Sequence, residues 1–329
     1  MESPAIFIVV PCYNEEAALP QTGGRLIALL ARLIEGGAAG ANSRIALVDD
    51  GSRDATWQVI ERLAGESSLV EGIKLSRNCG HQNALWAGLM AVRGRADAAI
   101  SIDADLQDDP EAIPRFLEKF REGCDVVYGV RSKRERDTAF KRLTAQGFYT
   151  FMRRMGVDVV YNHADYRLLS RRALDALSQY TEVNLFLRGM VPLLGFRTAE
   201  VPYERHERVA GESKYPLSKM LAFAMQGITS FSVKPIRWIA LLGACFALLG
   251  LLIALYALIS LAAGVAVAGW TSIMVSIWII GGVQLIALGL IGEYVGRVYT
   301  EVKRRPLYQI ERTITHYKGE NTDGGHEGE

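Results

Sequence analysis

A stretch without charged residues, 238–292, constrains the architecture of this chain more than any other feature. It contains no Asp, Glu, Lys or Arg, whereas the residues before it have the mixed charge of a soluble enzyme. It is too long for one membrane crossing of about 20 residues, and it divides near 264–272, where Gly, Ala, Thr and Ser replace a Leu/Ile run. The alternative is a buried hairpin of a soluble domain, but no polar face recurs at helical spacing. We therefore expect two transmembrane helices within residues 236–298.

Basic residues on both sides of this stretch predict its orientation. Lys234 and Arg237 precede the first expected crossing, and Arg297 and Lys303 follow the second. Lys and Arg near the ends of membrane helices favour the cytoplasmic side. We therefore expect both ends of the hairpin, and the soluble part of the chain, to be cytoplasmic.

Composition narrows the class of protein further. The four cysteines show no paired spacing, so we expect neither a disulfide framework nor a zinc site. The formal net charge is +1, and we expect no nucleic-acid partner. A chain of 329 residues, 50% of them hydrophobic, is long enough to bury a complete α/β core.

The first part of the chain alternates between two kinds of pattern. Short apolar runs rich in β-branched residues are separated by amphipathic stretches of helical period, which is typical of a doubly wound α/β domain. The runs that predict strands are 6–10, 45–48, 72–75, 98–102 and 126–128.

Three of the predicted strands end in polar sequence. Residues 11–16 follow the first strand, residues 49–54 follow the second, and residues 103–109 follow the fourth. Ligands of such sheets bind at the carboxyl ends of the strands, so we expect these segments to meet at one crevice. A dinucleotide site is disfavoured, because no Gly-x-Gly-x-x-Gly turn follows the first strand.

Asp103 and Asp105 are the candidate metal ligands. The two carboxylates lie two residues apart after an apolar strand and repel each other unless a cation lies between them. Gln107 continues the alternation with a neutral oxygen. A solvated acidic turn is the alternative for such a triplet taken alone. A divalent cation held here would neutralise a diphosphate ligand.

Motifs along the chain resemble those of family 2 glycosyltransferases with the GT-A fold. They are Val-Val-Pro-Cys-Tyr-Asn-Glu-Glu at 9–16, Val-Asp-Asp-Gly-Ser at 48–52, Ser-Arg-Asn-Cys-Gly at 76–80 and Asp-Ala-Asp-Leu-Gln-Asp at 103–108. Later segments at 165–168, 208–215, 227–232 and 292–297 are similar to the polyprenyl-phosphate branch of that family, which includes the bactoprenol glucosyltransferases. The resemblance runs from about Ile6 to about Pro306, and it implies a Rossmann-like mixed sheet.

The resemblance implies a nucleotide-sugar pocket at the strand ends. Pro11, Tyr13 and Glu15 would line it, Asp50 would accept a hydrogen bond from a uracil ring, and Arg77 would lie near the donor. The alternative for the segment around Asp50 is a structural Asx-type turn before a helix, capped by Ser52 or Asp54.

The resemblance also implies the metal and the reaction. Asp103 and Asp105, with Gln107, would hold Mg²⁺ or Mn²⁺ against the diphosphate, and Asp103 would also contact the nucleotide-sugar. The implied reaction is an inverting transfer of one sugar to polyprenyl phosphate. This acceptor is already an anion and needs little help from a base. Asp103, Asp105 and Arg131 would be the catalytic residues.

Basic residues are expected to bind the acceptor phosphate. Arg131, at the end of the strand 126–129, is assigned to this task together with Lys133 and Arg134. A solvated helix face is the alternative for such a basic run. The remaining candidates are two residues at the floor of the site and three in a loop before the membrane: Asp165 and Arg167, and Arg208, Ser213 and Lys214. For Asp165 and Arg167, the alternative is a structural ion pair.

The expected domain order follows from these assignments. A glycosyltransferase domain occupies 1–215, an amphipathic helix at the membrane surface 216–235, two transmembrane helices 236–298, and a cytoplasmic tail 299–329. For 216–235, a core helix of the soluble domain is the alternative. The expected location is the bacterial inner membrane, as a multi-pass protein.

Donor and partners are the least constrained part of the interpretation. Overall resemblance favours UDP-glucose as the donor, with UDP-N-acetylglucosamine next. The expected partners are the donor, a polyprenyl phosphate, the membrane, further copies of the chain in a homo-oligomer such as a tetramer, a downstream flippase and a second glycosyltransferase. A non-catalytic membrane scaffold, or a component of lipid-linked sugar translocation, is the alternative class. The intact acidic set at 103–107 argues against it.

Overall fold

An eight-stranded mixed sheet forms the centre of the protein, with the strand order β7-β5-β6-β4-β1-β2-β3-β8. The computed structural model describes residues 3–105, 107–131, 163–183, 185–204 and 269–316, with scattered positions between 236 and 252. The strands are β1 (Ile6–Cys12), β2 (Arg44–Asp49), β3 (Val70–Leu75), β4 (Ala98–Ser101), β5 (Val126–Arg131), β6 (His163–Ser170), β7 (Thr198–Tyr203) and β8 (Ile310–Ile314).

The pairing of the strands divides the sheet into two parts. β4, β1, β2 and β3 are parallel neighbours, whereas β6 runs antiparallel between β4 and β5, and β7 pairs in parallel with β5. The five predicted strands are confirmed as β1 to β5. In the parallel part, the carboxyl ends of β1, β2 and β4 lie along the same edge of the sheet, which is where their polar extensions were expected to meet.

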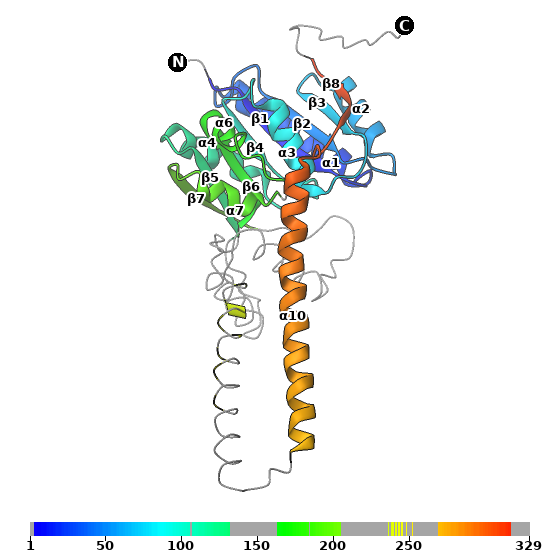
Figure 1. Ribbon diagram of the computed structural model, residues 1–329. Coiled ribbons are helices and arrows are strands. Elements are labelled where there is room, and N and C mark those ends of the chain that lie inside the picture. The colour runs from blue at the N-terminus through cyan, green and yellow to red at the C-terminus, as the bar shows by residue number, and fades with distance from the viewer. Residues whose placement is uncertain are drawn as a thin grey trace, which may run out of the picture.

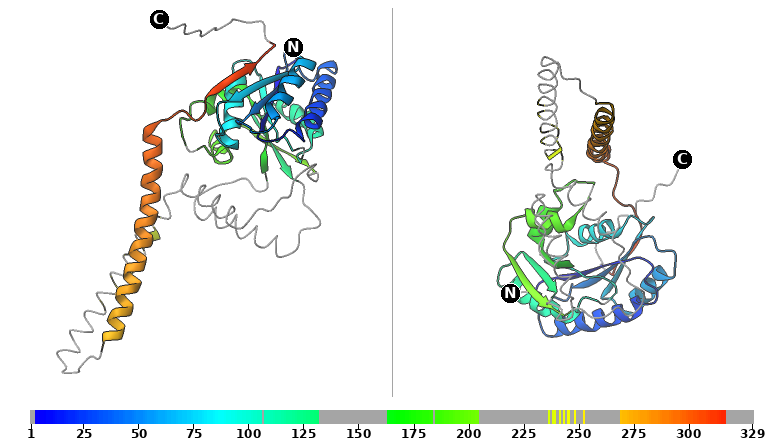
Figure 2. Two further views of the ribbon diagram at one scale, coloured as in Figure 1. Left: turned by 90° about the vertical axis from the view of Figure 1, so that its right-hand side faces the viewer. Right: turned by 90° about the horizontal axis from the view of Figure 1, so that it is seen from below.

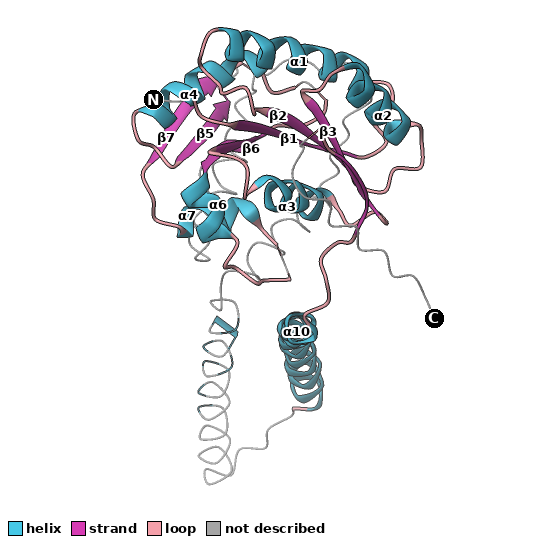
Figure 3. Cartoon of the chain, turned by 90° about the horizontal axis from the view of Figure 1, so that it is seen from above, coloured by secondary structure: helices cyan, strands magenta, loops and turns pink. Residues whose placement is uncertain are grey.

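Helices cover both faces of the sheet (Figure 3). One face carries α1 (Leu19–Glu35), α2 (Thr56–Glu66) and α4 (Ile113–Arg121), which follows a short 3-10 turn at Pro110–Ala112. The other face carries α3 (His81–Val92), α6 (Arg171–Leu177) and α7 (Leu187–Leu193).

β1 shows why the sheet needs cover on both sides. Ile8 and Val10 pack in the core under α1, α2 and α4, whereas Phe7 and Val9 pack in the core under α3, α6 and α7. Alternate side chains of a strand point to opposite faces, so an entirely apolar strand is stable only between two layers of helices. The sequence therefore folds as a three-layer α/β domain, as expected.

The helix α10 (Trp270–Lys303) projects away from the sheet (Figures 1 and 2). It exposes apolar side chains along its length, among them Leu285 (72% exposed), Ile286 (72%) and Val302 (74%). Within the described part of the chain, no helix combines the length and the hydropathy of a membrane span. The two-helix hairpin therefore stays a prediction, and the helix expected at 216–235 lies outside the described residues.

Residues expected in a C-terminal tail instead extend α10 and complete the sheet. α10 continues to Lys303, and β8 pairs antiparallel with β3 in the register Gly72↔Ile314 and Lys74↔Arg312. The Lys74 ammonium lies 2.9 Å from the Glu311 carboxylate, across these two strands. β8 therefore covers the edge that β3 would otherwise expose.

Candidate active site

A cavity of about 240 Å³ lies at the carboxyl ends of β1, β2 and β4. It brings together the three polar segments that follow these strands. Its lining comprises residues from all three and from the start of α3: Pro11, Cys12, Tyr13, Glu15, Asp50, Asn78, Gly80, His81, Ala84, Asp103, Ala104 and Asp105. Pro11, Tyr13, Glu15 and Asp50, which were expected to bind the donor, therefore share one pocket with the two expected metal ligands.

Asp50 fixes one wall of the cavity. Its buried carboxylate accepts backbone hydrogen bonds from Cys79 at 2.7 Å and Gly80 at 2.9 Å, and so joins the end of β2 to the loop after β3. Burial raises the pKa of Asp50, although the two backbone donors act in the opposite direction. Each carboxylate oxygen can accept more than one hydrogen bond, so these contacts are compatible with a further donor from a ligand.

The turn after Asp50 requires glycine. Gly51 has φ +63°, and a Cβ atom on it would lie 2.4 Å from the carbonyl carbon of Arg77. The Asx-type turn considered from the sequence is present at Asp54, which accepts from the Thr56 N–H at 3.0 Å, and Asp49 accepts from the Ser52 N–H at 3.1 Å. Arg77 itself is exposed and lies outside the cavity lining, which its neighbour Asn78 joins.

The acidic loop after β4 brings Asp103 and Asp105 to the cavity. Burial raises the pKa of Asp103 to about 6; His81 lowers it, and the nearby carboxylates of Asp108, Asp165 and Asp105 raise it further. Gln107 is buried outside the lining, and its N–H donates to Asp105 at 3.1 Å. The structure thus gives Gln107 a contact that stabilises the loop.

Two carboxylates on one loop fit a divalent cation that takes its other ligands from water and phosphate, as Mg²⁺ and Mn²⁺ do. The concentration of negative charge around Asp103 is what such a cation would offset. Among the residues that the structure describes, no cluster of three or more His, Cys, Asp or Glu side chains is arranged to hold a metal.

Arg131 stands beside this loop at the end of β5. Its guanidinium donates to Asp108 at 3.4 Å and to the Tyr203 hydroxyl at 3.2 Å, and 28% of its side chain is exposed. The Tyr203 hydroxyl in turn donates to Asp108. Asp108 and Tyr203 raise the pKa of Arg131 against the effect of burial, so the cation keeps its charge.

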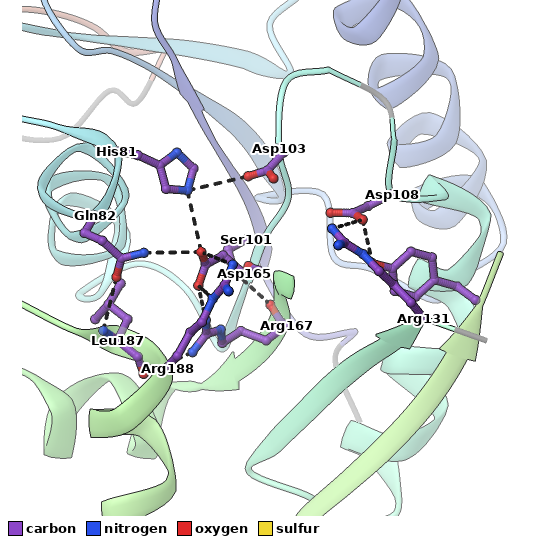
Figure 4. Close-up of polar contacts among 11 residues, drawn as sticks. His81, Gln82, Ser101, Asp103, Asp108, Arg131, Asp165, Arg167, Leu187 and Arg188 are labelled. Carbon is purple, nitrogen blue, oxygen red and sulfur yellow. Dashed lines mark hydrogen bonds and ion pairs between the residues drawn. The ribbon is translucent and has the colours of Figure 1, made fainter. Parts of the chain in front are cut away.

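A second charged cluster surrounds Asp165 (Figure 4). This buried carboxylate on β6 accepts from Arg167 and from Arg188, and the His81 ring lies 3.8 Å from it. Burial would raise the pKa of Asp165, but Arg188 and Arg167 hold it well below its ordinary value. Arg167 is 2% exposed and also donates to the Leu187 carbonyl, so the structural ion pair considered from the sequence is present.

The sequence interpretation missed some of the site residues. They are His81, Gln82, Asp108, Arg188 and Tyr203. His81 and Gln82 directly follow the motif at 76–80, and Asp108 lies within the motif at 103–108, so these three had a local signal. Arg188 and Tyr203 had none. The expected acceptor residues Lys133, Arg134, Arg208, Ser213 and Lys214 lie outside the described residues.

Comparison with known proteins decides the family. Residues 7–178 match the family described as "Glycosyl transferase family 2". This chain is a family 2 glycosyltransferase. The match includes β2 to β6, most of β1, and the acidic segments 49–54 and 103–109. The cavity therefore lies within the region that the family shares.

Relatives match this glycosyltransferase over almost its full length. The uncharacterized glycosyltransferase YkoT of Bacillus subtilis is 51% identical over 308 residues, covering 94% of this chain and 91% of the relative. The SfII prophage-derived bactoprenol glucosyl transferase of Shigella flexneri is 40% identical over 313 residues, covering 94% and 98%. The resemblance to bactoprenol glucosyltransferases inferred from the motifs is thus confirmed.

A solved structure is similar at lower identity. It is glucosyl-3-phosphoglycerate synthase from Mycobacterium tuberculosis in complex with Mn²⁺, UDP and phosphoglyceric acid. The identity is 19%, the TM-score is 0.46, and the match covers 69% of this chain and 76% of the synthase.

Proposed function

We propose that this glycosyltransferase moves a single sugar from a UDP-sugar to undecaprenyl phosphate and inverts the configuration of the anomeric carbon. UDP-glucose is the favoured donor, and UDP-N-acetylglucosamine is the next candidate. The observation that carries the proposal is one cavity whose lining includes Asp50 and Glu15 as well as Asp103 and Asp105. The base of a nucleoside diphosphate would donate a hydrogen bond to a carboxylate such as Asp50. The charge of its two phosphates would be offset by a cation held by Asp103 and Asp105.

The charges around the cavity support this reaction. The acceptor is a phosphate anion, whose oxygen forms a bond to the anomeric carbon as the bond from that carbon to the UDP oxygen breaks and the electron pair leaves with UDP. A divalent cation bound by Asp103 and Asp105 would act as a Lewis acid on the departing diphosphate. The chain itself supplies Arg131, a fixed guanidinium beside the same loop, for the acceptor phosphate.

The acceptor class is supported by two further observations. The Shigella relative that matches 94% of this chain is called a bactoprenol glucosyl transferase. The exposed apolar side chains of α10 suit contact with lipid rather than with water. We propose that α10 and the preceding uncharged segment form the membrane hairpin, with the sheet on the cytoplasmic side of the bacterial inner membrane. A homo-oligomer, a flippase and a second glycosyltransferase acting on the product remain proposed partners.

A transfer assay tests the proposal directly. The purified protein with Mn²⁺ is incubated with radiolabelled UDP-sugars and GDP-mannose, with and without undecaprenyl phosphate, and the label entering the organic phase is measured. Transfer from UDP-glucose that depends on the lipid is the expected result. Transfer from UDP-N-acetylglucosamine instead would retain the reaction and change the sugar. Absence of lipid-dependent transfer from every donor, with the protein folded, would refute the proposed function in favour of the scaffold class.

A further inference from the structure

Arg188 is a second cation at the active site, and we propose that it binds a substrate phosphate. Asp165 and Gln82 act as the residues that position it. The proposal rests on the proposed function, because the phosphate belongs either to the donor diphosphate or to the lipid acceptor. The shared chemistry is a phosphoryl oxygen bound by a guanidinium fork, and the experiment below distinguishes the two sources.

The geometry of Arg188 differs from that of a structural arginine. It lies in the first turn of α7, and its Nε and Nη2 atoms donate to the two oxygens of Asp165 at 3.3 and 3.1 Å (Figure 4). Thirty per cent of its side chain is exposed, whereas Arg167, which binds the same carboxylate, is 2% exposed. Arg167 is therefore enclosed in the interior, whereas part of the Arg188 side chain is accessible.

The charge balance at this cluster favours an anion. Asp165 carries one negative charge and faces the two guanidinium groups of Arg167 and Arg188. Asp165 is thus shared between two guanidinium groups, and Asp103 is a further negative charge that acts on Arg188. A phosphate would give the guanidinium of Arg188 an anion of its own.

The charges of two other site residues, Asp103 and Arg131, also act on Arg188. The negative charge of Asp103 raises its pKa, and the positive charge of Arg131 lowers it. The charges of the expected metal loop and of the expected acceptor cation therefore both act on Arg188, and the His81 ring links that loop to the Asp165 cluster by lying 3.6 Å from Asp103 and 3.8 Å from Asp165. Donor diphosphate and acceptor phosphate must meet between these two groups for transfer to occur.

Gln82 fixes Arg188 in place from the first turn of α3. Its side-chain amide donates to Asp165 at 3.2 Å, and its carbonyl oxygen accepts from the Leu187 N–H at 3.1 Å. One side chain therefore holds both the carboxylate that orients Arg188 and the start of the helix that carries it. Asp165 is occupied by two guanidinium groups and one amide, which makes it a positioning residue rather than a proton acceptor.

Two binding constants, both independent of turnover, test the proposal on the full-length protein in detergent. The first is the Kd of UDP with Mn²⁺, measured by calorimetry, and the second is the Kd of undecaprenyl phosphate, measured by thermophoresis. Arg188→Ala is expected to weaken one of them by about 10-fold to 100-fold, the loss typical of a charge-assisted hydrogen bond to phosphate. A weaker UDP complex identifies the donor diphosphate, and weaker lipid binding identifies the acceptor.

Further variants separate this role from a structural one. Arg188→Lys keeps the positive charge but loses the planar pair of guanidinium donors. We therefore expect it to weaken the same Kd by less than Arg188→Ala does. Gln82→Ala is expected to shift that constant in the same direction while the thermal midpoint stays near that of the wild type. Arg32→Ala is the matched control and should change neither constant, because it removes an exposed ion pair in which Nη2 of Arg32 on α1 donates to both carboxylate oxygens of Glu111.

The proposal is overturned if a folded Arg188→Ala protein keeps both constants within about twofold of the wild type. If that variant does not fold, Arg188→Lys and Gln82→Ala decide the question by the same criterion. Failure of the proposed function is a different result: the wild-type protein would transfer no sugar, while its two binding constants could still be measured and compared with those of the variants.

Discussion

Arg131 donates to the buried carboxylate of Asp108 across 3.4 Å and thereby joins the end of β5 to the loop after β4. Asp108 belongs to the same loop as Asp103 and Asp105, the carboxylates that line the cavity. The cation proposed for the acceptor phosphate and the ligands proposed for the metal are therefore held relative to each other by one short segment. Geometry that is fixed before the substrates arrive need not be reorganised during the reaction.

Tyr203→Phe should loosen Arg131 without removing it. The variant loses the hydroxyl that donates to Asp108 and accepts from Arg131. We expect the KM for undecaprenyl phosphate to rise by only about 3-fold to 10-fold, because Arg131 keeps its ion pair with Asp108, with little change in the KM for the donor. Steady-state kinetics with each substrate varied in turn measure this. Tyr180→Phe, three residues after the end of α6, is the control, and an unchanged acceptor KM in Tyr203→Phe would contradict the role of Arg131.

Asp105→Asn should abolish transfer through loss of the metal. The substitution keeps the shape of the side chain and removes one of the two carboxylate charges that the loop after β4 brings to the cavity. We expect turnover to fall by about 100-fold or more, and the affinity for Mn²⁺ in the presence of UDP to fall with it. Manganese titration followed by electron paramagnetic resonance measures binding separately from catalysis. Near wild-type turnover in this variant would refute the metal assignment.

Gly51→Ala should distort the wall of the cavity that Asp50 fixes. The left-handed φ of +63° is strained for alanine, and the added Cβ would overlap the backbone at Arg77. We expect a loss of stability of about 1–3 kcal/mol, together with weaker UDP binding. Gly65→Ala on α2 is the matched control, because nothing lies within 4 Å of its Cβ position and alanine favours a helix. Thermal unfolding in detergent compares the two variants, and equal midpoints would contradict the argument.

The ion pairs of Asp165 predict a dependence of stability on pH. Burial opposes ionisation of this carboxyl, but Arg188 and Arg167 hold its folded pKa below the ordinary value of 3.8. A lowered folded pKa means that the stabilisation is fully present above about pH 4 and is lost as the pH falls through the folded value. We expect Asp165→Asn to be about 3–5 kcal/mol less stable than the wild type at neutral pH.

That difference should shrink between pH 4 and pH 2, because the wild type alone loses this contribution as it takes up the proton. The neighbouring groups that face Asp165 are Arg167, Arg188, Gln82 and His81. Urea unfolding at pH 7, pH 4 and pH 2.5 measures the difference. A gap that stays constant across this range would show that the carboxylate charge does not stabilise the fold.

Local pattern in the sequence was sufficient to predict the parallel part of the sheet and the carboxylates at its edge. Apolar β-branched runs specify β1 to β5, and the position of Asp50 and Asp103 after such runs follows directly from the topology of parallel strands. Arg188 could not be found in this way. Its contact with Asp165 joins β6 to α7 across 23 residues, and only tertiary packing creates it.

β8 was missed for a related reason. Ile310–Ile314 contains two charged residues and is exposed at every position except Ile314, so nothing local distinguishes it from a solvated tail. β8 is stabilised by backbone pairing with β3 and by the contact of Ile314 with the core. Both partners are formed by residues far from β8 in the sequence. A strand of this kind is specified by its partner more than by its own residues.

The position of β8 in the chain has a consequence for biosynthesis. β3 is made early, whereas the strand that covers its edge is made only after α10 has left the ribosome. Until then the nascent domain carries an open strand edge, which is a template for pairing with other chains. Completion of the sheet therefore reports that synthesis has passed the uncharged segment, and a chain stalled within that segment would be prone to aggregate at β3.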